Sequence, residues 1–181
     1  MYRLFRSVFL FAFFGASLSA MTINFSTAAV GTTGGGQTIL RFSYNLSGVS
    51  LLLNQELDVR FDPTIYSSLL NPVAPALLYD ALVLQPNNPP GAFGDYSLLA
   101  LVNSPSTAGP FSVDATLVAG KAIPTSQPFF INQLDRNGAF VARLDSGSTV
   151  NLVPEPSTLA MAAGGFISAL LIRAAKRRSR Q

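Results

Sequence analysis

Two aspartates four positions apart are the residues whose types and spacing best suit catalysis. Asp58 and Asp62 could form a carboxylate pair for glycoside hydrolysis, in which one acid protonates the leaving group and the other acts as base or nucleophile. Alternate residues of a strand share a face, so the pair requires a strand that continues through Asp62. Pro63 indicates that the strand ends first, which favours a solvent-facing Asp58 and a turn residue at Asp62. We therefore predict no catalytic residue.

The segment Asp135-Arg136-Asn137-Gly138 is rich in side-chain oxygen, as calcium-binding turns are. A complete calcium loop supplies ligands from about six spaced positions and ends in a bidentate glutamate. No glutamate stands at the required distance downstream. Asn137-Gly138 is instead typical of the tip of a tight hairpin, because both residue types tolerate positive φ. The sequence predicts a hairpin here, with neither a metal site nor a cofactor.

A polar loop followed by aromatic residues is the third candidate. Asn87 and Asn88 precede Pro89-Pro90-Gly91, and Phe93 and Tyr96 follow. Amide groups can hydrogen-bond sugar hydroxyls, and aromatic rings can stack on sugar faces. Asn87, Asn88, Phe93 and Tyr96 are therefore a candidate ligand loop. The alternative is that the two aromatic residues simply enter a β-sheet core.

Composition narrows the chemistry further. The sequence contains no cysteine and no histidine. This excludes the usual zinc ligands, cysteine nucleophiles and any Ser-His-Asp triad within the chain. We expect a protein that is not an enzyme.

The positive charge of the chain lies mostly at its two ends. The formal net charge is +3, but seven of the twelve Lys and Arg residues lie before Met21 or after Val153. Between these positions eight acidic residues outnumber five basic ones, for a net charge of −3. The five basic residues are scattered, whereas phosphate contacts require clustered Lys and Arg. No nucleic-acid partner is expected.

An alternation of apolar and polar residues dominates the middle of the chain and defines the elements that must position these side chains. It is clearest at 40–46, 57–61 and 111–117, each typical of a strand with one buried face. Further strands are expected at 22–25, 49–54, 79–85, 96–102, 129–134 and 139–144, separated by Gly- and Pro-rich breakers. For residues 75–84 a helix is the alternative.

Many short strands between such turns favour an all-β fold. We predict a single antiparallel β-sandwich, Ig-like or jelly-roll-like, over residues 21–150. The polar residues 145–151 are expected to form a short tether after it.

The N-terminus has the order of a secretory signal peptide. Arg3 and Arg6 precede the apolar residues 8–14, and small residues follow up to Ala20. We predict a signal peptide at residues 1–20, cut by signal peptidase near Ser19 or Ala20 after export through the Sec machinery. A retained N-terminal anchor is the alternative.

The C-terminus combines a proline-rich element, an apolar stretch and a basic cluster. Val153-Pro154-Glu155-Pro156 precedes apolar residues 159–172, which as a helix would span about 21 Å against a hydrocarbon core of about 30 Å. A single transmembrane helix at about 157–172 is therefore just long enough. Basic residues that flank a span stay in the cytoplasm, so the cluster places everything before Ser157 outside; it consists of Arg173, Lys176, Arg177, Arg178 and Arg180.

This arrangement closely resembles the PEP-CTERM sorting signal of Gram-negative bacteria. The resemblance covers residues 153–180 and implies that an exosortase, a membrane-embedded cysteine transpeptidase, recognises and cuts near Pro154-Glu155-Pro156. The two prolines restrict the backbone and favour an extended, exposed segment, which suits a protease-like site. The chain lacks the Leu-Pro-x-Thr-Gly motif of Gram-positive sortase substrates. The alternative is an ordinary single-span protein.

Together these features predict an exported protein in three parts: a signal peptide at 1–20, an ectodomain at 21–150 and a sorting signal at 151–181. We expect a periplasmic ectodomain held at the inner membrane before processing, then a cell-surface or extracellular product. The resemblance implies a non-enzymatic surface or matrix protein associated with exopolysaccharide. A carbohydrate-binding or adhesion module and a carboxylate-based hydrolase are the alternatives.

Overall fold

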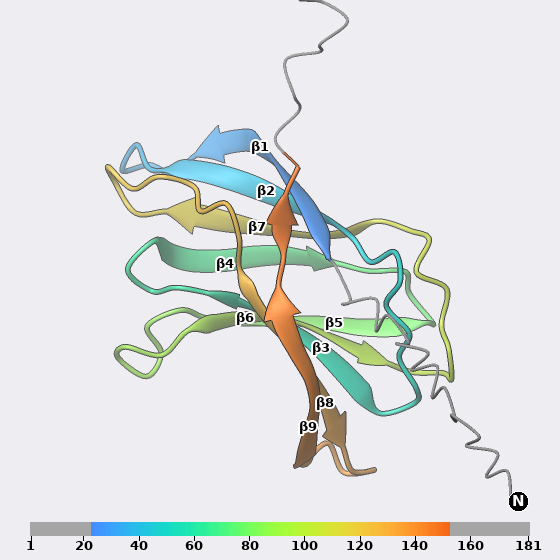
Figure 1. The fold of residues 1–181 in the computed structure, drawn as a ribbon. Coiled ribbons are helices and arrows are strands. Elements are labelled where there is room, and N and C mark those ends of the chain that lie inside the picture. The colour runs from blue at the N-terminus through green and yellow to red at the C-terminus, as the bar shows by residue number, and fades with distance from the viewer. Residues whose placement is uncertain (1–22, 153–181) are drawn as a thin grey trace, which may run out of the picture.

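The computed structural model describes residues 23–152, which form two five-stranded β-sheets (Figure 1). The first sheet has the order β10-β1-β2-β7-β4, with β1 at Asn24–Thr32, β2 at Thr38–Asn45, β4 at Tyr66–Val73, β7 at Phe111–Leu117 and β10 at Val150–Asn151. The second has the order β5-β6-β3-β8-β9, with β3 at Gln55–Phe61, β5 at Tyr79–Leu84, β6 at Gly94–Ala100, β8 at Pro128–Leu134 and β9 at Phe140–Ser148.

The predicted all-β sandwich is confirmed. Neighbouring strands are antiparallel, apart from the short parallel pair of β1 and β10. Within residues 23–152, no helix is long and apolar enough to cross a membrane. The predicted signal peptide and the predicted transmembrane helix lie outside the described residues.

Alternation along the strands builds the core. Leu40, Phe42 and Tyr44 of β2 point inward and are buried, while the residues between them are exposed. Aromatic rings then join the two sheets. Phe42 meets Phe61 of β3 edge-on with ring centroids 5.4 Å apart, and Tyr44 stacks on Tyr96 of β6 at 5.7 Å.

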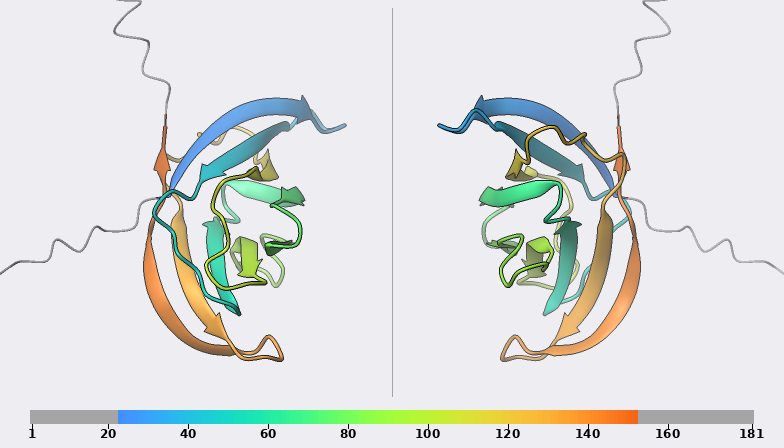
Figure 2. Two further views of the ribbon diagram at one scale, coloured as in Figure 1. Left: turned by 90° about the vertical axis from the view of Figure 1, so that its right-hand side faces the viewer. Right: turned by 90° about the vertical axis from the view of Figure 1, so that its left-hand side faces the viewer.

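The last two strands link the sheets on one side of the sandwich. β9 pairs with β8 in the second sheet, and β10 pairs with β1 in the first. Figure 2 shows β1 and the β8–β9 hairpin curving around the outside of the molecule. Thr149, between β9 and β10, is fully buried, and its backbone N–H donates to the Gln127 carbonyl at 2.8 Å.

The expectation of a polar tether at 145–151 is therefore wrong. These residues are the end of β9, the buried Thr149 and the whole of β10. They are polar because β9 is an edge strand whose side chains lie mostly in solvent, not because the backbone is unpaired.

Three element predictions are corrected. Residues 49–54 form a loop that buries Val49 and Leu51, so apolar content there reflects burial without strand pairing. The helix alternative at 75–84 is wrong, because a turn at Pro75 leads directly into β5. β4 was not expected, since Pro72 lies within it. An edge strand tolerates proline, and the pairing with β7 is irregular between Leu70 and Val73.

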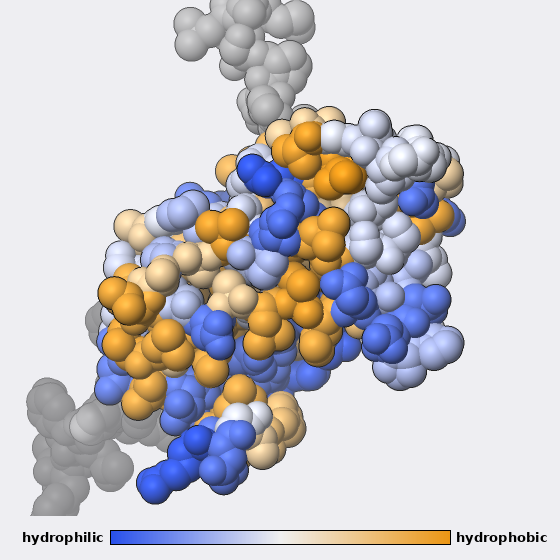
Figure 3. Space-filling view, turned by 180° about the vertical axis from the view of Figure 1, so that it is seen from behind, coloured by the Kyte–Doolittle hydropathy of each residue, from blue (hydrophilic) through white to orange (hydrophobic). Residues whose placement is uncertain are grey.

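The surface is mixed in character. Figure 3 shows apolar patches among polar residues on the face opposite to that of Figure 1. Several large apolar side chains are exposed, of which Leu77 is the most exposed at 87%. Such residues are common on protein surfaces and indicate no function singly.

Candidate functional site

The structure does not bring Asp58 and Asp62 together as a catalytic pair. Asp58 accepts hydrogen bonds from the Ser97 hydroxyl and, at 2.6 Å, from the Asn132 amide. Asp62 lies in the β3–β4 turn, where its Oδ1 accepts from the Thr64 backbone N–H at 2.7 Å. β3 ends at Phe61, as Pro63 indicated, so the turn interpretation of Asp62 is confirmed. The solvent-facing interpretation of Asp58 is wrong, because this residue is only 6% exposed.

Asp58 belongs to a cluster of acidic residues on the outer face of the second sheet. β3 contributes Glu56 and Asp58. β6 contributes Asp95, which lies opposite Arg60 of β3 in the register of the two strands. Burial raises the pKa of Glu56 to about 7, with smaller contributions from Asp58 and Asp95. Burial likewise raises the pKa of Asp95 to about 6, against the opposing effect of Arg60, whose Nε lies 3.1 Å from Asp95 Oδ1.

Aromatic and cationic groups cover one side of this cluster. Two guanidinium groups lie over the ring of Phe130, with Arg143 at 3.6 Å and Arg60 at 5.1 Å from its centroid. Among residues 23–152, no group of three or more acidic side chains is arranged to hold a metal ion. The cluster escaped sequence analysis because it depends on the register of β3, β6 and β8. The hydrogen bonds of Asp58 link three neighbouring strands of this sheet, β3, β6 and β8.

The Asp135–Gly138 segment is a hairpin turn between β8 and β9, as predicted. Asp135 Oδ1 accepts hydrogen bonds from the backbone N–H groups of Asn137 at 2.8 Å and Ala139 at 2.9 Å. These bonds lower the pKa of Asp135. Gly138 has a φ of 80°, which glycine adopts without strain.

The candidate ligand loop divides into separate parts. Asn87 Oδ1 accepts from the Gly91 backbone N–H at 2.8 Å and so closes the loop on itself, while Asn88 is exposed. Tyr96 lies in the core, where its hydroxyl donates to the Val73 carbonyl at 2.6 Å. The core interpretation is thus confirmed for Tyr96. Phe93 remains at the surface, 41% exposed.

A pocket of about 240 Å³ brings together residues from two of the separate sequence hypotheses. We call it the rim pocket, because it lies where β3 ends and β6 and β8 begin. Asp62 comes from the β3–β4 turn and Phe93 from the loop before β6. The remaining lining residues are Arg60, Ile65, Tyr66, Pro124, Ser126, Gln127 and Pro128.

Three buried polar atoms of residues that line the rim pocket lack hydrogen-bond partners among the described residues. One is Nε of Arg60, which lies 3.1 Å from Asp95 Oδ1. The other two are the hydroxyl of Tyr66 and Nε2 of Gln127, in residues that are 1% and 2% exposed. Burial, with a contribution from the nearby Asp62 carboxylate, raises the pKa of Tyr66. Buried polar groups without hydrogen-bond partners are rare and costly in native proteins. Sequence analysis missed Tyr66 and Gln127, because distant segments meet here only in the folded chain.

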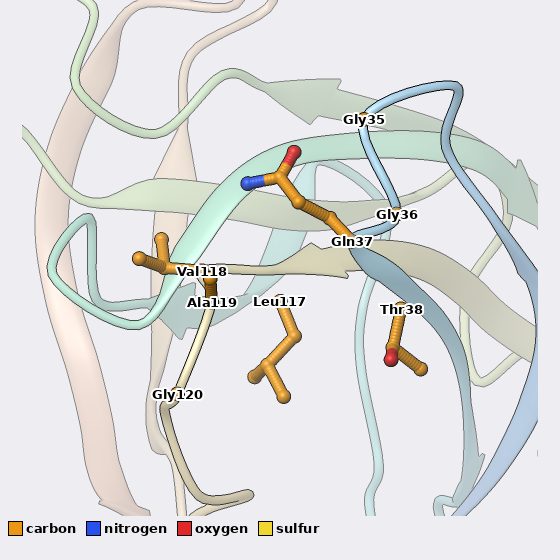
Figure 4. A pocket seen from close by; sticks show the side chains of 8 residues that line it. All are labelled: Gly35, Gly36, Gln37, Thr38, Leu117, Val118, Ala119 and Gly120. Atoms are coloured by element: carbon orange, nitrogen blue, oxygen red, sulfur yellow. The ribbon is translucent and has the colours of Figure 1, made fainter.

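A second pocket, of about 210 Å³, lies beside the β1–β2 turn and the end of β7. Its lining is largely backbone and aliphatic, with Gly35, Gly36 and Gly120 among its residues. Figure 4 shows the side chains of Gln37, just before β2, and Thr38, its first residue, pointing in different directions. This lining offers no charged side chain and little chemistry.

The predicted sorting residues, Val153 to Pro156, and the basic residues from Arg173 onward lie outside the described residues. The fold continues almost to them. Leu152 donates its backbone N–H to the Phe25 carbonyl at 2.7 Å, two positions before Pro154.

Comparison with protein families gives one match. Residues 152–178 match the model of the PEP-CTERM protein-sorting motif. Neither the curated proteins nor the solved structures gave a match. The motif supports an exported protein with a membrane-anchored precursor, and it implies an exosortase as the processing partner. The C-terminal residues of this chain therefore match the PEP-CTERM sorting signal, and the resemblance is confined to that segment.

Proposed function

We propose that this chain is a non-enzymatic surface or matrix protein associated with extracellular polysaccharide, anchored by its C-terminal helix until an exosortase processes it. The observation that carries the proposal is the sorting motif at residues 152–178, directly behind a folded β-sandwich. The association with polysaccharide rests on the resemblance of the sorting signal. Signal peptidase and the Sec machinery would act at the N-terminus.

The end of the fold bears on how processing would occur. Leu152 is hydrogen-bonded to β1, and an extended chain reaches only about 7 Å over the two residues to Pro154. A transpeptidase acting near Pro154-Glu155-Pro156 would work close against the folded domain. Before processing, the domain would stay in the layer next to the membrane.

Mass spectrometry of the protein from a host with a matching exosortase tests the processing. We expect no peptide from Ser157 onward in the mature product. The same host without the exosortase is the control, and there the C-terminal peptides should remain. An intact tail in both hosts would contradict the proposal.

A carbohydrate-binding or adhesion module is the second candidate, and the rim pocket favours it. We do not propose a hydrolase that uses Asp58 and Asp62. Asp58 is enclosed by Ser97 and Asn132, and Asp62 is part of a turn.

A further inference from the structure

We propose that the rim pocket binds one neutral pyranose unit, through hydrogen bonds at its base and stacking on Phe93. This deepens the proposed function by naming what the domain recognises. It rests on that function only for the source of the sugar, an extracellular polysaccharide.

Two buried residues of the lining, Tyr66 and Gln127, carry hydrogen-bonding groups that the described residues do not use. Gln127 Oε1 accepts from the Tyr44 hydroxyl at 2.8 Å, which orients the amide. Its Nε2 and the hydroxyl of Tyr66 are then left without partners among residues 23–152. An amide N–H donates, and a tyrosine hydroxyl can donate or accept. Sugar hydroxyls also do both and can satisfy these two groups at once.

The charges of the lining favour a neutral ligand. Arg60 and Asp62 both line the pocket, with opposite charges. Because the two charges oppose each other, the lining gives neither an anionic nor a cationic ligand a net electrostatic advantage over a neutral one. The Asp62 carboxylate has lone pairs beyond the one used by Thr64, so it can accept from a sugar hydroxyl.

The walls of the pocket suit the apolar face of a sugar ring. Phe93, which is 41% exposed, lines the pocket together with Ile65 and two prolines. A pyranose presents C–H groups on one face and hydroxyls at its edge, so the ring can stack on Phe93 while its hydroxyls reach the base. The pocket is smaller than the range of about 300–1,000 Å³ typical of drug-sized ligands, which fits one ring and not an oligosaccharide.

The wall that carries Gln127 is fixed from behind by β10 and the residues before it. Thr149 Oγ1 accepts from the Gln127 N–H at 2.9 Å, and the Asn151 N–H donates to the Thr125 carbonyl at 2.9 Å. A wall held in this way loses little conformational entropy when a ligand binds. The backbone that carries Gln127 is therefore already ordered.

Isothermal titration calorimetry of the full chain tests the proposal, in a detergent without a sugar headgroup. The probes are the methyl glycosides of glucose, galactose and mannose, with methyl glucuronide as the anionic comparison, each up to about ten millimolar. We expect at least one neutral glycoside to bind and the glucuronide to bind more weakly. Phe93→Ala should weaken binding roughly tenfold through lost stacking. Phe140→Ala, which removes an exposed ring from β9 outside the pocket, should leave binding unchanged.

Tyr66→Phe separates recognition from stability. The hydroxyl has no partner within the described residues, so its removal should leave the thermal midpoint unchanged or raise it, while sugar affinity falls. Absence of binding by any neutral glycoside to the folded chain would overturn the proposal. So would binding that is indifferent to both Phe93→Ala and Tyr66→Phe. A chain that binds the sugar but keeps its tail contradicts only the processing proposal, and a processed chain that binds no sugar contradicts only this one.

Discussion

At the scale of single residues, the position of a carboxylate decides what it does. Asp58 and Asp62 are four positions apart, yet one is enclosed by side chains of β6 and β8 and the other orders a turn. Burial raises the pKa of Asp58, against the stabilising effect of the hydrogen bond from Ser97 on its charged form. Asp58 therefore has a structural role, and its loss should leave the side chains that bind it without an acceptor.

Asp58→Ala should destabilise the domain. Ser97 and Asn132 would lose their acceptor, and the side-chain oxygen Oδ1 of Asn132 already lacks a partner within residues 23–152. We expect a loss of about 2–3 kcal/mol in the free energy of unfolding, measured by urea titration. Asp80→Ala, at an exposed position of β5, is the control and should change stability little. Equal stability of the two variants would show that the Asp58 contacts contribute nothing.

At the scale of elements, β9 is the strand whose role differs most from its sequence. Its side chains are mostly exposed, yet it covers the edge of β8 and leads into β10 in the other sheet. Gly147 makes this possible. It pairs with Phe129, and a Cβ at this position would lie 2.8 Å from the ring of Phe129, a core residue.

Gly147→Ala should therefore destabilise the domain although Gly147 is exposed. The added methyl group must displace a ring that the core holds in place, at a cost of roughly 1–3 kcal/mol. Chemical denaturation measures the effect. Gly34→Ala is the matched control, because a Cβ there meets nothing within 4 Å. If both substitutions had the same small effect, the close packing of β9 on Phe129 would be refuted.

At the scale of the whole molecule, the balance of buried acids sets how stability depends on pH. Glu56 and Asp95 have pKa values of about 7 and about 6 in the folded chain, above their ordinary values of 4.5 and 3.8. The folded state thus holds more protons than the unfolded state between these limits. Asp114, bound by Arg41 at 2.7 Å, has a lowered pKa, so its ionisation affects stability only at lower pH.

The thermal midpoint should consequently fall as the pH rises from about 4 to about 7. The stabilisation is fully present below the unfolded pKa values and is lost as Glu56 and Asp95 ionise in the folded state. Calorimetry across this range measures the trend. Glu56→Gln keeps the side chain neutral, so it should reduce the fall and change little at the acidic end. A midpoint that rises with pH across this window would contradict the assigned burial of these acids.

The sequence by itself determined the class of fold and the presence of a sorting signal. Both depend on local patterns: alternation along strands such as β2 buries one face, and the order of proline motif, apolar stretch and basic cluster is readable without any tertiary contact. The turn at Asp62 and the hairpin at Asp135 were predictable for the same reason, because adjacent residues set them.

Only the tertiary structure decided what the polar residues do. The register between strands places Asp58 against Ser97 and Asn132. It also places the side chain of Tyr96 in the core. The rim pocket unites Asp62, Phe93 and Gln127 from segments far apart in the chain, and no local pattern encodes that meeting. Strand pairing likewise decided that the end of segment 145–151, which was expected to be a tether, forms β10. Contacts between distant segments depend on packing that forms only when both sheets are in place.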